Sequence, residues 1–136
     1  MGIANVDLSS FHDAELTRLM ISRESKQMSL DYLTEGKALL QLRATGLHAF
    51  RAVDVGMQNV VSQILSTNLH EVSETEIIDT LEWISATLDS PPYLSGDVIA
   101  SYVNKIKKRE IFLVIIEPSV GGEICLLAEE VTFSHG

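Results

Sequence analysis

The sequence predicts an α+β domain, in which an antiparallel, mostly meandering sheet of about six to seven strands has two helices packed on one face. Three observations predict it. Period-two alternation of apolar residues dominates the first half, helical spacing marks two segments of the second half, and β-rich runs return near the end. The 136 residues show no repeat, low-complexity tract or linker, so we expect residues 1–136 to form a single domain.

Alternation in the first half predicts strands with one buried face. The connections between the alternating stretches are short and turn-like, which favours hairpins. We expect a turn at Ala44-Thr45-Gly46 and a separate strand over 47–53. Residues 60–65 form either a further strand or a short helix, and their β-branched side chains favour the strand. The alternating stretches are 19–23, 27–32 and 39–44.

Two helices are predicted in the second half. Ser73 followed by Glu76 forms a capping box, and a second helix begins near Ser95. The first helix ends before Ser90-Pro91-Pro92, because proline cannot continue it. The apolar stripes are Ile77, Ile78, Leu81, Ile84 and Leu88 in the first helix, and Val98, Ile99, Tyr102, Val103 and Ile106 in the second.

The end of the chain predicts a hairpin of two apolar strands. Residues 111–116 form an unbroken apolar run that is typical of a strand buried on both faces, and 123–133 return beside it. The turn between them is expected over 118–122, where glycines supply positive φ. Cys125 has apolar neighbours in its strand, so we expect its thiol to be buried and unreactive.

Composition argues against several classes of protein. A formal net charge of −9, from 19 acids and 10 bases, argues against a nucleic-acid partner. The single cysteine excludes an internal disulfide. The first residues lack the pattern of a signal peptide, and apolar runs such as 112–116 and 124–128 are too short to span a bilayer. We therefore expect a cytoplasmic protein with no membrane partner.

No set of catalytic or metal-ligating residues stands out. The four histidines occur at none of the spacings that zinc sites use, so we expect no metal and no cofactor. If 11–16 is extended, His12 and Asp13 point to opposite faces. Polar side chains around Gly56 usually cap their own loop, and a polar recognition loop or pocket is the alternative. The candidate residues for that loop or pocket are His12, Asp13, Asp54, Gln58 and Asn59.

Acidic residues concentrate around the first predicted helix. Residues 69–136 contain twelve acids and four bases, against seven and six in residues 1–68, and no lysine or arginine occurs from 70 to 104. Such a face is either only solvated or a docking surface, because unpaired charges of one sign repel each other and attract a basic partner. The candidate partner-binding residues are Glu74, Asp79, Glu82 and Asp89.

Three short motifs resemble a group of small bacterial α+β proteins of unknown function, which share an opening of the form FHDAxL. Here the opening is Phe11-His12-Asp13-Ala14, within 10–16. The other motifs are 50–54 together with 58–61, and 117–123. Similar folds occur among immunity proteins of bacterial toxin systems. The resemblance implies an α+β domain and supplies no catalytic residue, cofactor or substrate.

These observations predict a non-enzymatic, cytoplasmic protein–protein interaction domain. Its immunity-like role is to occlude a basic protein partner through the acidic face of the first helix. The alternative is a small-molecule-binding or enzymatic domain, with a pocket between the sheet and the helices.

Overall fold

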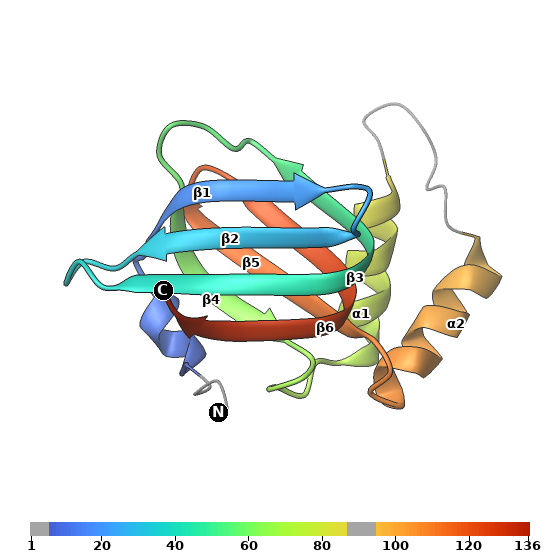
Figure 1. Ribbon diagram of the computed structural model, residues 1–136. Coiled ribbons are helices and arrows are strands. Elements are labelled where there is room, and N and C mark those ends of the chain that lie inside the picture. The colour runs from blue at the N-terminus through green and yellow to red at the C-terminus, as the bar shows by residue number, and fades with distance from the viewer. Residues whose placement is uncertain (1–5, 87–94) are drawn as a thin grey trace.

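A computed structural model of the protein describes residues 6–86 and 95–136, which form six antiparallel strands, two α-helices and one 3-10 turn (Figure 1). The strands close into a barrel in the order β1-β2-β3-β6-β5-β4, and β4 returns to β1. The predicted α+β class is confirmed, with six strands in the described residues. The elements are η1 (Leu8–Phe11), β1 (Glu15–Ser22), β2 (Gln27–Leu33), β3 (Leu39–Val53), β4 (Val60–Ser66), α1 (Glu74–Ser85), α2 (Gly96–Lys107), β5 (Phe112–Val120) and β6 (Glu123–His135).

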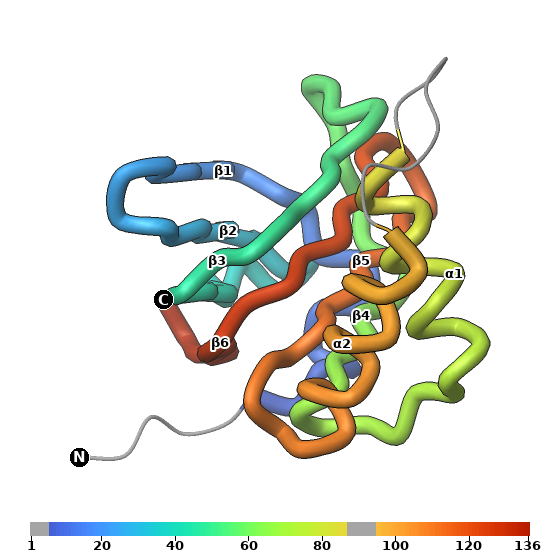
Figure 2. Tube along the Cα trace, turned by 90° about the vertical axis from the view of Figure 1, so that its right-hand side faces the viewer, coloured from blue at the N-terminus to red at the C-terminus, as the bar shows by residue number. Residues whose placement is uncertain are grey.

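Strand β3 continues through the position where the sequence predicts a turn. Gly46 takes the left-handed conformation (φ 63°), and His48 is an extra residue in the pairing with β6. These features bend β3 without ending it, because β6 pairs with β3 on both sides of the bend (Figure 2). The turn at 44–46 and the separate strand over 47–53 are therefore wrong. Residues 60–65 lie in β4, so the strand predicted there is confirmed.

The chain enters β1 through η1 instead of an extended segment. The carboxylate of Asp7 accepts a hydrogen bond from the backbone N–H of Ser9 (3.0 Å), which caps this turn. The turn places Phe11 inside the barrel, where its ring centroid lies 5.3 Å from that of Tyr32 and 5.9 Å from that of Phe133. Residues 11–14 are therefore not extended, and of the segment 11–16 only Glu15 and Leu16 lie in a strand.

Inward-facing side chains from all six strands fill the interior of the barrel. The period-two alternation predicted for β2 and β3 is observed, with apolar residues inside and polar residues outside. Strand β2 pairs with β3 in register, so that their inward residues meet across the two strands. These inward residues are Met28, Leu30, Tyr32, Leu40, Leu42 and Ala44.

Both helices begin at the predicted caps. The hydroxyl of Ser73 accepts a hydrogen bond from the backbone N–H of Glu76 (3.2 Å), and the hydroxyl of Ser95 accepts one from that of Val98 (3.3 Å). Within the described residues, neither helix is long and apolar enough to cross a bilayer. The first helix ends at Ser85, where Ala86 is already extended, which is earlier than the predicted end before Ser90. Leu88, the last residue of its predicted stripe, lies outside the described residues.

A second buried cluster joins the two helices to β5 and β6. The central residues of both strands are buried on both faces, as their unbroken apolar runs predict. Alternate residues of each strand therefore belong to the barrel interior and to this second cluster. The second cluster contains Ile77, Leu81, Ile84, Ile99, Val103 and Ile106 from the helices, and Leu113, Ile115, Cys125 and Leu127 from the strands.

Substitution of Gly46 tests the bend in β3. A Cβ at this position would lie 2.8 Å from the Cβ of Glu129, and the left-handed φ is unfavourable for alanine. We expect Gly46→Ala to lower the free energy of unfolding by about 1–3 kcal/mol in chemical denaturation.

Gly56→Ala is the matched control, because Gly56 has a negative φ and no atom within 4 Å of an added Cβ. We expect it to change the free energy of unfolding by at most about 1 kcal/mol. Equal losses in the two variants would contradict a special role for Gly46.

Each buried cluster contains one group that burial keeps protonated. Cys125 is 3% exposed, and burial, reinforced by the negative charges of Glu123 and Glu117, raises the pKa of its thiol to about 12. Tyr32 is 1% exposed, and burial raises the pKa of its hydroxyl well above the usual value. The burial predicted for Cys125 is confirmed.

These two groups predict that the fold loses stability in alkali. Both groups ionise more readily in the unfolded chain. Their contribution to the free energy of unfolding is therefore complete below the pKa values of the unfolded chain, about 8.5 for the thiol and 10 for the tyrosine hydroxyl. It is lost as pH rises above those values. We expect the free energy of unfolding to fall by up to about 1.4 kcal/mol per pH unit for each group. Denaturation of Cys125→Ala between pH 8 and 10 should show a flatter dependence, and an unchanged slope would contradict the assignment to the thiol.

Candidate functional site

Two stripes of side chains, one on each helix, form the walls of a groove between α1 and α2. Residues four positions apart lie above one another on a helix, so each stripe runs along its helix axis. The floor consists of Ile99 and Val103, and the groove has a volume of about 360 Å³. The stripes are Glu74, Ile78 and Glu82 on α1, and Gly96, Ala100 and Asn104 on α2.

An ion pair closes one end of this groove. The ammonium of Lys107, in the last turn of α2, lies 3.2 Å from the carboxylate of Glu74, in the first turn of α1. Both side chains are more than half exposed, so the pair contributes little to stability. It does compensate one of the acids for which the sequence indicated no basic partner. The two helices therefore run antiparallel, and Glu82 lies toward the opposite end of the groove.

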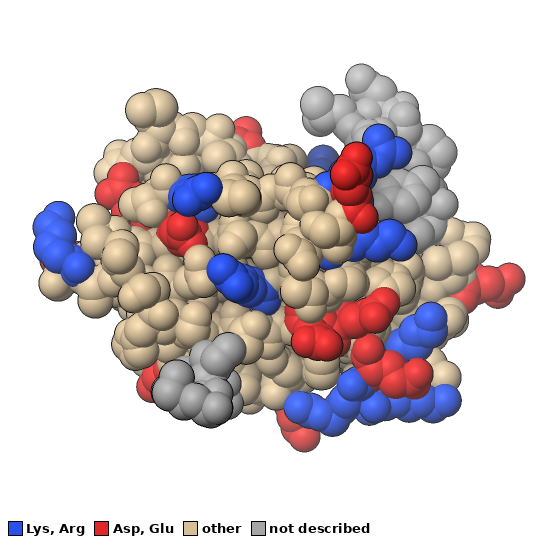
Figure 3. Space-filling model, in the orientation of Figure 1, with Lys and Arg blue, Asp and Glu red and all other residues tan. Residues whose placement is uncertain are grey.

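The remaining candidate acids of α1 have no basic partner among the described residues. Asp79 and Glu82 are exposed and make no ion pair or side-chain hydrogen bond with another described residue. Asp89 lies outside the described residues. Figure 3 shows acids and bases intermixed toward the lower right, over the region where Figure 1 places α2. The helical side of the molecule in this view therefore carries both positive and negative charges.

The predicted polar loop is built around a buried asparagine. Asn59 is 6% exposed, and its amide exchanges two hydrogen bonds with the backbone of Gly56, at 3.0 and 2.8 Å. Its Oδ1 also accepts a hydrogen bond from the N–H of Gly122 (3.0 Å). Gly121 lies so close to this loop that an added Cβ would clash with the Gln58 carbonyl oxygen. Asn59 therefore holds the loop against the β5–β6 turn, which is confined to residues 121–122 because β5 extends to Val120.

The other candidate residues of that loop or pocket remain at the surface. Asp54 and Gln58 are exposed, and His12 lies beside Asp13 with 3.2 Å between Nδ1 and Oδ2. The prediction that His12 and Asp13 point apart is therefore wrong, because the backbone turns at Asp13 (φ 63°). Within residues 6–86 and 95–136, no three His, Cys, Asp or Glu side chains converge as a metal site would require.

A histidine that the sequence did not single out links the barrel to α2. The Nε2 of His48 lies 2.9 Å from Oε2 of Glu129, and its Nδ1 lies 3.4 Å from the hydroxyl of Tyr102. The carboxylate fixes the imidazole in orientation, as it does where histidine acts as a base. A hollow of about 260 Å³ adjoins this group and is also lined by Lys105 and Glu110.

These contacts could not be predicted from the sequence, because they join residues far apart in the chain. Glu129 and Tyr102 are 81 and 54 residues away from His48, so no local motif contains them. The missing side chain of Gly46 is what lets Glu129 lie against β3 and reach the imidazole.

Comparison with known proteins adds one distant likeness in structure. No family model and no curated protein matches the chain. A crystal structure of an uncharacterized protein from Neisseria gonorrhoeae is similar over 90% of this chain and 90% of that chain, with 14% identity and a TM-score of 0.42.

Proposed function

We propose that this protein is a non-enzymatic, cytoplasmic protein–protein interaction domain that docks a basic, amphipathic helix of a partner in the α1–α2 groove. The observation that carries the proposal is the construction of the groove, which combines an apolar floor, one wall of small residues and one uncompensated acid, Glu82, toward one end. Helix-in-groove recognition uses this combination, with apolar anchors in the groove and charges at its rim.

The apolar part of the groove can receive side chains from such a helix. Ile78 of α1 and Ala100 of α2 add apolar surface to the two walls. Gly96 has no side chain, and nothing lies within 4 Å of its absent Cβ, so a partner can approach the backbone of α2 there.

Charge determines the kind of helix that fits. Glu74 is compensated by Lys107 at one end, whereas Asp79 and Glu82 are uncompensated along α1. A lysine- or arginine-bearing segment would gain attraction at the uncompensated end and would avoid Lys107 at the other. The net charge of −9 steers a basic partner at longer range. In an immunity-like role, this surface would occlude a basic partner.

A second candidate function rests on the hollow beside His48. This hollow lies where α2 meets β3 and β6, the kind of position that a pocket between sheet and helices would occupy. The oriented imidazole favours a small-molecule-binding or acid–base role there. The α1–α2 groove offers the larger apolar surface, so the interaction function is the one we place first.

Neutralising the acids of α1 tests the docking proposal. The probe is a synthetic amphipathic helical peptide with one leucine stripe and lysines on its remaining positions. We expect Asp79→Asn combined with Glu82→Gln to slow its association about three- to tenfold at low salt and to flatten the salt dependence, because steering is lost. Stopped-flow fluorescence of a labelled peptide measures both quantities.

The control variant removes two exposed acids at the far end of the barrel. Glu15→Gln combined with Glu35→Gln changes the net charge equally, and neither residue lines the groove. We expect this variant to associate at nearly the rate of the unchanged chain. Failure of the peptide to bind, or equal effects of the two double variants, would overturn the proposal.

A further inference from the structure

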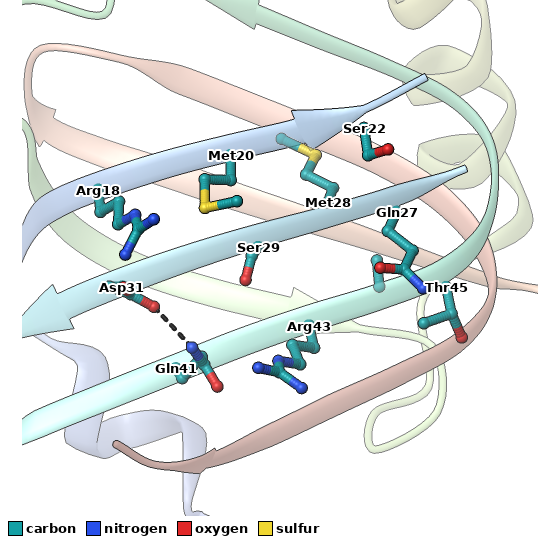
Figure 4. A pocket seen from close by; sticks show the side chains of 11 residues that line it. Arg18, Met20, Ser22, Gln27, Met28, Ser29, Asp31, Gln41, Arg43 and Thr45 are labelled. Atoms are coloured by element: carbon teal, nitrogen blue, oxygen red, sulfur yellow. Dashed lines mark hydrogen bonds between the residues drawn. The ribbon is translucent and has the colours of Figure 1, made fainter. Parts of the chain in front are cut away.

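The outward face of β1, β2 and β3 carries polar side chains over a shallow hollow of about 390 Å³ (Figure 4). The strand register arranges them in rows that run across the three strands. One row is Met20, Ser29 and Arg43, and the neighbouring row is Arg18, Asp31 and Gln41. None of the residues that line the hollow belongs to α1 or α2, so it is separate from the groove proposed as the docking surface.

The hollow exists because a small residue lies at the centre of this face. Ser29 occupies the middle strand, with Met20 opposite it on β1 and Arg43 opposite it on β3. Opposite side chains in a sheet are about 5 Å apart, so the two longer side chains stand on either side of the serine. Figure 4 shows this arrangement, with Arg18 one row away on β1.

The two arginines of this face are not used to hold the structure together. Arg51 donates a hydrogen bond to the carbonyl of Trp83 (2.7 Å), and Arg109 donates one to the carbonyl of Asn68 (3.0 Å). Arg18 and Arg43, by contrast, make no ion pair or side-chain hydrogen bond with another described residue.

The carboxylate opposite Arg18 in the strand register already has another hydrogen-bond partner. Asp31 lies directly opposite Arg18 in the register, yet its Oδ1 accepts a hydrogen bond from the amide of Gln41 (2.8 Å). No guanidinium nitrogen of Arg18 lies within 4.0 Å of a carboxylate oxygen of Asp31, the limit for an ion pair. The guanidinium groups thus remain available to an anion even though the chain as a whole is strongly acidic.

We propose that this hollow binds a small anionic molecule, which places a carboxylate or phosphate group between Arg18 and Arg43 and its remaining atoms over Ser29 and Met20. Guanidinium groups bind both oxyanions through paired, charge-assisted hydrogen bonds. The hydroxyl of Ser29 offers a further donor, and Met20, which is 48% exposed, offers an apolar contact. The volume suits a metabolite-sized ligand.

The test is a titration of the whole chain with inorganic pyrophosphate and, separately, with succinate, at constant ionic strength in a phosphate-free buffer. NMR of 13C-methyl-labelled methionines reports the site, because Met20 lies in it and Met57, which is 99% exposed, lies in the 54–59 loop. We expect a saturable shift of the Met20 methyl signal and none of the Met57 signal. The arm that saturates at the lower concentration identifies phosphate or carboxylate as the preferred group.

Four variants separate specific binding from general charge. We expect Arg18→Gln and Arg43→Gln each to raise the dissociation constant about tenfold. Arg23→Gln is the matched control, since this substitution changes the net charge equally. Arg23 is exposed and does not line the hollow. We expect Asp31→Asn to lower the dissociation constant, because it removes the negative charge beside the ligand, an effect that a purely structural role would not produce.

Two results would overturn the proposal. One is the absence of a saturable Met20 shift with either anion. The other is an equal weakening by Arg23→Gln and by the two variants of the hollow. Neither result bears on the α1–α2 groove, which shares no lining residue with this face.

Discussion

The close approach of Glu129 to Gly46 is the constraint on which the rest of the structure depends. Because Gly46 has no Cβ, the side chain of Glu129 crosses β3 and reaches His48, which in turn contacts Tyr102 of α2. The left-handed glycine and the extra residue at 48 bend β3 while its pairing with β6 continues. One long bent pair of strands can therefore both complete the barrel and carry the helical layer.

The barrel and the helical layer each have their own buried cluster. Strands β5 and β6 separate them, since alternate residues of each strand face the barrel interior and the helices. Burial on both faces leaves the central residues of these strands with no surface for a ligand. The exposed features therefore lie on either side of them, in the groove between α1 and α2 and on the outer face of β1, β2 and β3. The two proposed sites thus belong to different elements and can be tested independently.

Local sequence signals predicted the individual strands and helices well, but they predicted the continuity of β3 and the contacts between distant elements poorly. Alternation identified β2 and the first half of β3, and Ser73 and Ser95 marked the starts of both helices. Gly46 was misread because a glycine with positive φ serves a turn and a bulge equally, and only the pairing with β6 distinguishes them. The Glu74–Lys107 pair and the His48 contacts were equally out of reach, because each joins residues more than thirty positions apart. Asn59 capped its own loop, as residues of its type usually do.

A double-mutant cycle with Gly46→Ala and Glu129→Gly tests most directly whether the bend depends on this contact. The free energy of unfolding of the four proteins would be measured by chemical denaturation. If Glu129 must cross a bare backbone at position 46, Glu129→Gly should be less destabilising in the Gly46→Ala background than in the unchanged chain, by about 1 kcal/mol or more. Losses that add to within about 0.5 kcal/mol would show that the two residues act independently and would contradict the dependence of the bend on their contact.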